Sequence, residues 1–167
     1  MKNTKQIALC GMLTALALGL SYVESAFPLL LVIPLPGVKL GLANLVTVFA
    51  LYALGAQPAL LILIARCVLG GIFAGNLNAL LYSLLGGLVA MCVMIVLSRL
   101  PKLSIYGVSI GGAAGHNCGQ ILAAVITLGN TAPLYYLPFL LLISLATGAV
   151  TGLLAGLLFQ ALRHTNL

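Results

Sequence analysis

The chain has 167 residues, of which 63% are hydrophobic and 5% are charged, and its mean hydropathy is +1.27. About a quarter of the residues of a soluble domain are charged, so this composition predicts an integral membrane protein surrounded by lipid. Seven basic residues and one acidic residue give a net charge of +6. The basic residues are scattered among apolar runs and form no patch that could follow phosphates, which excludes nucleic acid as a partner.

The acidic inventory is one glutamate, Glu24, with no aspartate. Metal sites built from carboxylates and paired carboxyl groups for acid/base catalysis both need more acidic oxygens than this. The four cysteines stand singly inside apolar runs without Cys-x-x-Cys spacing, so they indicate neither zinc nor disulfides. We therefore predict a protein that is not an enzyme and that has no metal and no cofactor.

Apolar runs of about 20 residues are long enough to cross a bilayer, and they divide the chain into six predicted transmembrane helices within a single integral membrane domain, 1–167. The first helix is predicted over 6–26. Three prolines follow in the segment 27–37, and because proline forbids a regular helix, this segment is predicted to be a proline-rich outer loop. The second helix is predicted over 38–55.

Turn residues separate the remaining helices. Pro58 is tolerated in a first turn, and the third helix is predicted over 58–75. The fourth covers 78–98 and ends at the polar linker that contains Arg99 and Lys102. No charge occurs from 103 to 162, a stretch too long for one crossing, and the turn residues 129–133 divide it into helices over 104–128 and 134–162.

The basic residues predict the orientation, because cytoplasmic loops of membrane proteins carry an excess of lysine and arginine. With a cytoplasmic N-terminus and six crossings, five basic residues face the cytoplasm and only Lys39 lies outside. The five are Lys2, Lys5, Arg99, Lys102 and Arg163. We therefore predict a multi-pass protein of the inner (plasma) membrane, a six-helix bundle with both termini cytoplasmic.

Several polar side chains fall in the outer half of the predicted bundle. Asn44 lies near the outer start of the second helix, and His116, Asn117 and Gln120 lie past the middle of the fifth. Buried polar groups in a bilayer must face a cavity or one another. We predict that these four line a substrate site open to the outside for a small polar molecule. The alternative is that they form hydrogen bonds between helices.

Arg66 is predicted to lie near the middle of the bilayer. A guanidinium group suits a carboxylate or a phosphate, so Arg66 below the site, with Lys39 at its mouth, extends the predicted substrate-binding set to an anionic compound. The alternative is a structural arginine that binds backbone carbonyls at a helix break. Glu24 is its only acidic candidate partner and lies near the outer end of the first helix, so pairing would require the helix or loop to dip inward.

Small residues recur at every fourth position in three predicted helices, a spacing that lets helix backbones approach closely. In the fifth and sixth helices we predict that these stripes pack within the bundle. The first helix has Gly11, Ala15 and Gly19, a face that could also dock a partner's helices.

Three segments together resemble a bacterial membrane family: Gly37 to Asn44, the Arg66-x-x-Leu-Gly70 segment, and Ser104 to Gln120 with its Ala-Ala-Gly-His-Asn-Cys-Gly-Gln sequence. This family is labelled heptaprenyl diphosphate synthase component I, also called the Gx transporter family, and the likeness covers nearly the whole chain. More distantly, the six helices, the proline-rich loop and the small-residue first helix are similar to the substrate-binding S components of energy-coupling factor (ECF) transporters.

The two resemblances imply two functions. An S component captures its substrate from outside and docks through its first helix, here Gly11, Ala15 and Gly19, on a coupling membrane subunit and two ATPases. Because the chain has no phosphate-binding loop of its own, such partners would supply the energy. The first hypothesis is therefore a substrate-binding subunit of a small-molecule transporter. The second is a non-catalytic membrane accessory component in prenyl-diphosphate or menaquinone synthesis, with a soluble prenyltransferase as partner.

Overall fold

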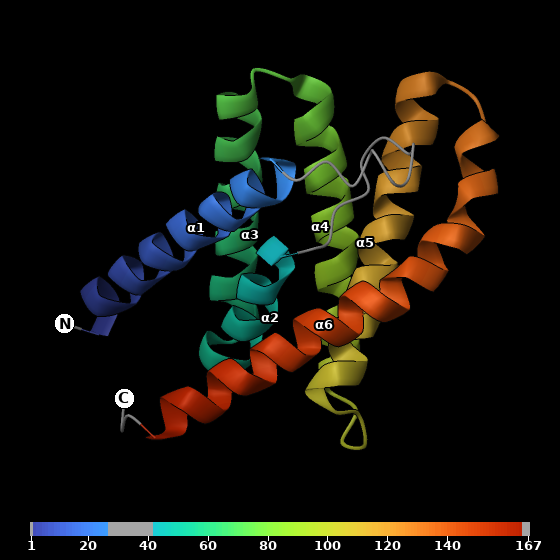
Figure 1. The fold of residues 1–167 in the computed structure, drawn as a ribbon. Coiled ribbons are helices and arrows are strands. Elements are labelled where there is room, and N and C mark those ends of the chain that lie inside the picture. Colours follow the sequence, from blue (N-terminus) through green and yellow to red (C-terminus); the bar gives the residue numbers. More distant parts are fainter. Residues whose placement is uncertain (1, 27–41, 165–167) are drawn as a thin grey trace.

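The computed structural model describes residues 2–26 and 42–164, and within these ranges it contains helices and no strands (Figure 1). The prediction of an all-helical protein is confirmed. The predicted proline-rich loop lies outside the described residues. In chain order the elements are α1 (Lys2–Ala26), α2 (Leu42–Leu54), α3 (Ala56–Ala74), α4 (Leu77–Ser98), α5 (Ile105–Leu128), the short 3-10 helix η2 (Ala132–Tyr136) and α6 (Leu137–His164).

Four of these helices, α1, α3, α4 and α6, contain segments long and apolar enough to cross a membrane. The described part of α2 has 13 residues, which at a rise of about 1.5 Å per residue is about 20 Å long, less than the hydrocarbon core. Helix α5 has 24 residues but includes His116, Asn117 and Gln120, which make it less apolar. The helices therefore define a protein of membrane type, and the six-crossing count stays a prediction.

The predicted helix boundaries differ from the structure mainly at polar ends and near prolines. Helix α1 begins at Lys2 rather than at residue 6, because hydropathy marks only the apolar part of a helix. Helix α3 begins at Ala56, which places Pro58 in its first turn. Before α6, Pro133 occupies the start of η2, so the last predicted helix is a 3-10 turn followed by an α-helix.

Figure 1 shows α3, α4 and α5 as antiparallel neighbours, with α1 and α6 crossing them obliquely. Helix α4 packs against α3 and, most extensively, against α5, whose other main neighbour is α6. Helix α1 packs against α2 and α3, and α2 also contacts α6. The beginning of α1, the α4–α5 connection and the end of α6 lie at the same end of the bundle.

Short links hold these helices in place. Gly55 alone joins α2 to α3, and its φ of +93° lies in a region that glycine adopts at little cost. Between α3 and α4, the side chain of Asn76 accepts hydrogen bonds from the backbone N–H groups of Asn78 (2.9 Å) and Ala79 (3.3 Å). This is helix capping by a preferred residue type. Such brief connections require each pair to run antiparallel.

The core lies where α2, α3 and α4 meet. Its largest fully buried apolar side chains are Ile62, Leu63, Met91, Met94, Val48 and, from α5, Val108. The outside of the bundle is also apolar: exposed fractions reach 66% for Leu61, 65% for Ile72 and 65% for Leu142. Apolar side chains this exposed over most helices would be a liability in water, so the surface fits a hydrocarbon solvent.

The glycine stripes of α5 and α6 lie at helix contacts. A methyl group added to Gly119 would lie 2.5 Å from the carbonyl oxygen of Leu85, and one added to Gly148 would lie 2.5 Å from the Cα atom of Ile110. Because both neighbours are backbone atoms, only glycine allows these helices to approach so closely. The prediction that these two stripes pack within the bundle is confirmed.

Candidate functional site

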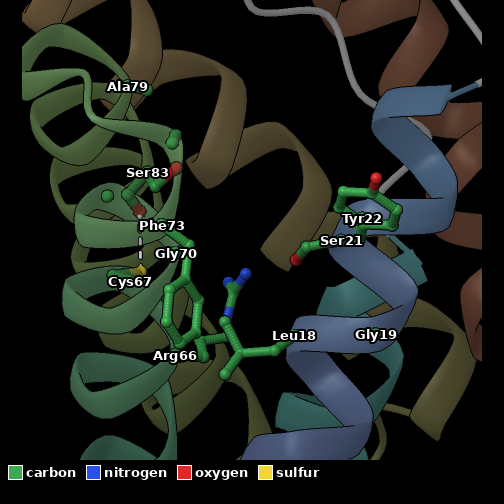
Figure 2. Close-up of a pocket in the computed structure, with 12 residues that line it drawn as sticks. Leu18, Gly19, Ser21, Tyr22, Arg66, Cys67, Gly70, Phe73, Ala79 and Ser83 are labelled. Carbon is green, nitrogen blue, oxygen red and sulfur yellow. Dashed lines mark hydrogen bonds between the residues drawn. The ribbon is translucent and has the colours of Figure 1, made fainter.

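Arg66 lies at the middle of α3 and is 8% exposed. Its side chain points from α3 toward α1 (Figure 2). Among the described residues the guanidinium group has no hydrogen bond and no ion pair, and its Nε atom is buried without a partner. Glu24 is also buried, at 4% exposure, but it forms no ion pair with Arg66. Among the described residues, Arg66 therefore has neither the acidic partner that was considered for it nor backbone carbonyl partners at a helix break.

A cavity of about 610 Å³ lies between α1, α3 and α4 and includes Arg66 in its wall. It is in the size range of small-molecule sites. Phe73 and Tyr22 are each 77% exposed, so the cavity reaches the surface of the bundle at both. The lining residues are Leu18, Gly19, Ser21 and Tyr22 of α1, Arg66, Cys67, Gly70, Gly71, Phe73 and Ala74 of α3, and Ala79 and Ser83 of α4.

Two hydroxyl groups face the same cavity from opposite sides. Ser21 comes from α1 and Ser83 from α4, and Figure 2 shows Arg66 between them. Neither hydroxyl has a hydrogen bond with another described residue. The backbone carbonyl of Ser83 accepts a hydrogen bond of 3.4 Å from the thiol of Cys67, which joins α4 to α3 beside the arginine. The cavity thus combines largely apolar walls with one cation and two available hydroxyls.

Two of the predicted site residues lie together on another part of the bundle. A methyl group added to Gly86 of α4 would lie 2.9 Å from Cε1 and Nδ1 of His116 and 3.0 Å from Cγ of Gln120. Both side chains therefore lie over Gly86, as their spacing of four residues on one helix face predicts. Gln120 is 6% exposed.

Asn117 points to a different neighbour. It is 6% exposed, and its Nδ2 donates a hydrogen bond of 2.9 Å to the backbone carbonyl of Leu140 in α6. Adjacent residues of a helix are about 100° apart, so Asn117 faces α6 while His116 faces α4. This contact fits the alternative of interhelical hydrogen bonding.

Asn44 lies beside α5, one helical turn away from His116. Its Nδ2 would be 3.7 Å from a methyl group added to Gly112, four residues before His116. Asn44 is 6% exposed and its Oδ1 is buried without a hydrogen bond. Lys39 lies outside the described residues.

The structure therefore divides the predicted substrate-binding set. His116 and Gln120 share one contact surface, Asn117 lies on the α6 side of α5, Asn44 lies beside Gly112, and Arg66 lines the cavity between α1, α3 and α4. Whether any of them binds substrate stays a prediction.

Ser21 and Ser83 line the cavity, but no pattern in the sequence marks them as site residues. Their position depends on where α1 crosses α3, which no periodic pattern reports. One local signal was present: Gly70 lies four residues after Arg66, on the same face of α3, and a glycine there leaves open space beside a long side chain.

The predicted docking residues of α1 are all exposed. A methyl group added to Gly11 or to Gly19 would have nothing within 4 Å. The stripe is therefore not used for packing among the described helices, in contrast to those of α5 and α6.

These features define a helical membrane-type protein with a buried arginine in a largely apolar cavity, where no other described residue pairs with it. The family model described as heptaprenyl diphosphate synthase component I matches residues 13–158, which include all six helices in whole or in part. The chain belongs to this family. Comparison with curated proteins and with solved structures gives no match.

Proposed function

We propose that the protein is a non-catalytic membrane component of prenyl-diphosphate synthesis, which holds a soluble prenyltransferase at the bilayer. The name of its family supports this, since a component I implies a second component. The observation that carries the proposal is the pairing of an apolar helical exterior with a chain that has no aspartate and one glutamate. Ionisation of a prenyl diphosphate relies on carboxylate-bound Mg²⁺, so the partner supplies the chemistry and this chain supplies the membrane surface.

Co-purification followed by an activity assay tests this proposal. The tagged full chain is purified from native membranes, and co-purifying proteins are identified by mass spectrometry. Elongation of farnesyl diphosphate with labelled isopentenyl diphosphate is then measured for the chain alone, for the recovered prenyltransferase alone and for both together. We expect recovery of a prenyltransferase, no activity from this chain alone, and greater activity or longer products from the mixture. Recovery of ATPases without a prenyltransferase would contradict the proposal.

The substrate-binding subunit of a transporter is the second candidate. The exposed stripe of Gly11, Ala15 and Gly19 supports it, because a face left free of internal packing can receive a coupling subunit. The same purification distinguishes the two functions: a transporter subunit would bring down a membrane coupling protein and ATPases.

We also propose that the protein lies in the inner (plasma) membrane, crosses it six times and has both termini in the cytoplasm. The support is that the three segments that contain five of the seven basic residues lie at one end of the bundle (Figure 1). That end would be cytoplasmic by the positive-inside rule.

A further inference from the structure

We propose that the cavity around Arg66 binds the phosphorylated head group of a membrane amphiphile, whose apolar chain leaves the cavity between α1 and α3 into the lipid. The class of the head group, a phosphate or diphosphate, rests on the proposed function. The existence of an anion site rests on the cavity alone.

The first argument is the state of the arginine. Arg66 is more than nine-tenths buried as a residue, and its Nε atom has lost contact with solvent without gaining a hydrogen bond among the described residues. Arginine inside a bilayer is costly and normally has a partner. A ligand with a negative charge removes this cost when it binds, and the planar donors of the group match a phosphate in two-point contact.

The second argument is the set of groups around the arginine. Ser21 and Ser83 reach the cavity from α1 and α4 on either side of Arg66, and their hydroxyls are unbonded within the described chain (Figure 2). Each can donate one hydrogen bond to a phosphate oxygen. Three helices therefore present donors to one space.

The third argument is the shape and polarity of the cavity. Its remaining walls are largely apolar, including Leu18 and Phe73, and it reaches the outside of the bundle at Phe73 and Tyr22. Since that outer surface is apolar, the opening leads toward acyl chains. A purely hydrophilic ion would leave these walls without contact, whereas an amphiphile covers them.

The test uses the full chain in nanodiscs of zwitterionic phosphatidylcholine. The protein has no tryptophan, so Phe73→Trp at the rim supplies a single fluorescent reporter in every variant. The probes are farnesyl diphosphate, farnesol and inorganic pyrophosphate, and a parallel arm replaces part of the phosphatidylcholine with phosphatidylglycerol. We expect saturable binding of farnesyl diphosphate, with at least tenfold weaker binding of farnesol and of pyrophosphate.

The variants locate the site. Arg66→Gln should weaken farnesyl diphosphate binding at least tenfold, and the matched change Arg99→Gln, at an exposed residue in the α4–α5 connection, should leave it unchanged. Gly70→Leu fills the cavity beside Leu18, which lies 3.6 Å from the position of an added methyl group, and should abolish binding. Ala146→Leu, at an exposed position of α6, is its control.

The melting temperature of the ligand-free protein distinguishes a ligand-binding arginine from a purely structural one. Removing an unpaired buried charge should preserve or raise the melting temperature of the ligand-free protein, while abolishing the rise that farnesyl diphosphate produces. A lower melting temperature for ligand-free Arg66→Gln, together with unchanged probe binding, would overturn the inference.

The soluble probe and the anionic lipid show what kind of ligand the site takes. Pyrophosphate that binds as tightly as farnesyl diphosphate would overturn the amphiphile and leave a soluble anion site. Competition by phosphatidylglycerol would support the site and assign it to membrane lipid, and absence of competition would assign it to the prenyl diphosphate. Binding is measured on the isolated chain, so failure to recover a prenyltransferase would refute the proposed function without touching this result.

Discussion

At the scale of single residues, the bundle accommodates buried polar groups in two ways. Asn117 satisfies its amide by donating to the backbone of α6, and Ser109 and Thr151 share a hydrogen bond of 2.7 Å between α5 and α6. Arg66 and the Oδ1 atom of Asn44 have no such partners among the described residues. The paired groups join helices, whereas Arg66 lines the cavity that we propose as an amphiphile site.

The Asn117 contact gives a testable stability change. Asn117→Ala removes the donor to Leu140 and should lower the free energy of unfolding by about 1 kcal/mol, the range found for hydrogen bonds between membrane helices. Unfolding by sodium dodecyl sulfate in mixed micelles, followed by circular dichroism, measures it. Cys118→Ala, at the exposed neighbouring position, is the control. If Asn117→Ala instead abolished binding of a co-purifying small molecule with no loss of stability, the interpretation as an interhelical contact would be wrong.

At the scale of elements, helix α5 organises one half of the protein through its glycines. Gly119 allows the backbone of α4 to approach, and α6 contributes Gly148 at its own crossing with α5. These close contacts explain why α4, α5 and α6 pack more tightly than the α1 side, where the cavity lies.

Substitution by alanine should affect stability differently for a glycine at a helix contact and for a glycine on the exposed face of α1. Gly119→Ala places a carbon atom 2.5 Å from the carbonyl oxygen of Leu85, and since a backbone cannot move aside alone, we expect a loss of about 1–3 kcal/mol from overpacking. Gly11→Ala meets nothing within 4 Å and should be neutral or slightly stabilising, because alanine favours helix. Thermal unfolding of both variants tests the difference. Equal effects would contradict the assignment of close packing to α5.

The order of the helices could be predicted from the sequence, because each apolar run ends at glycine, proline or charged residues. The grouping of site residues could not. His116 and Asn117 are neighbours in the chain, yet the helical rotation turns one toward α4 and the other toward α6. The hydroxyls around Arg66 were missed because the crossing point of α1 over α3 depends on tertiary packing.

At the scale of the whole molecule, the distribution of charge supports the proposed orientation in the membrane. The beginning of α1, the α4–α5 connection and the end of α6 lie together, opposite the turn between α5 and η2 (Figure 1). Five of the seven basic residues belong to the first group of segments. A bilayer therefore meets a molecule with one strongly basic end.

This orientation can be measured with cysteine labelling. In a chain whose four native cysteines are replaced by alanine, Thr131→Cys and Lys102→Cys place single thiols at exposed positions of opposite ends. We expect a membrane-impermeant maleimide to label Thr131→Cys equally in intact and in permeabilised spheroplasts. Labelling of Lys102→Cys should rise at least fivefold when the spheroplasts are permeabilised. Reversed labelling would place the basic end outside and refute the proposed topology.

The single-residue connection at Gly55 also bears on how a bulky ligand could reach Arg66. With one residue between them, α2 and α3 cannot swing apart, and α2 is held further by its contacts with α6. The α3 wall of the cavity is therefore the fixed one. We expect α1, which contacts mainly α2 and α3, to be the wall that moves, so that ligand exchange would be a displacement of the first helix within the membrane plane.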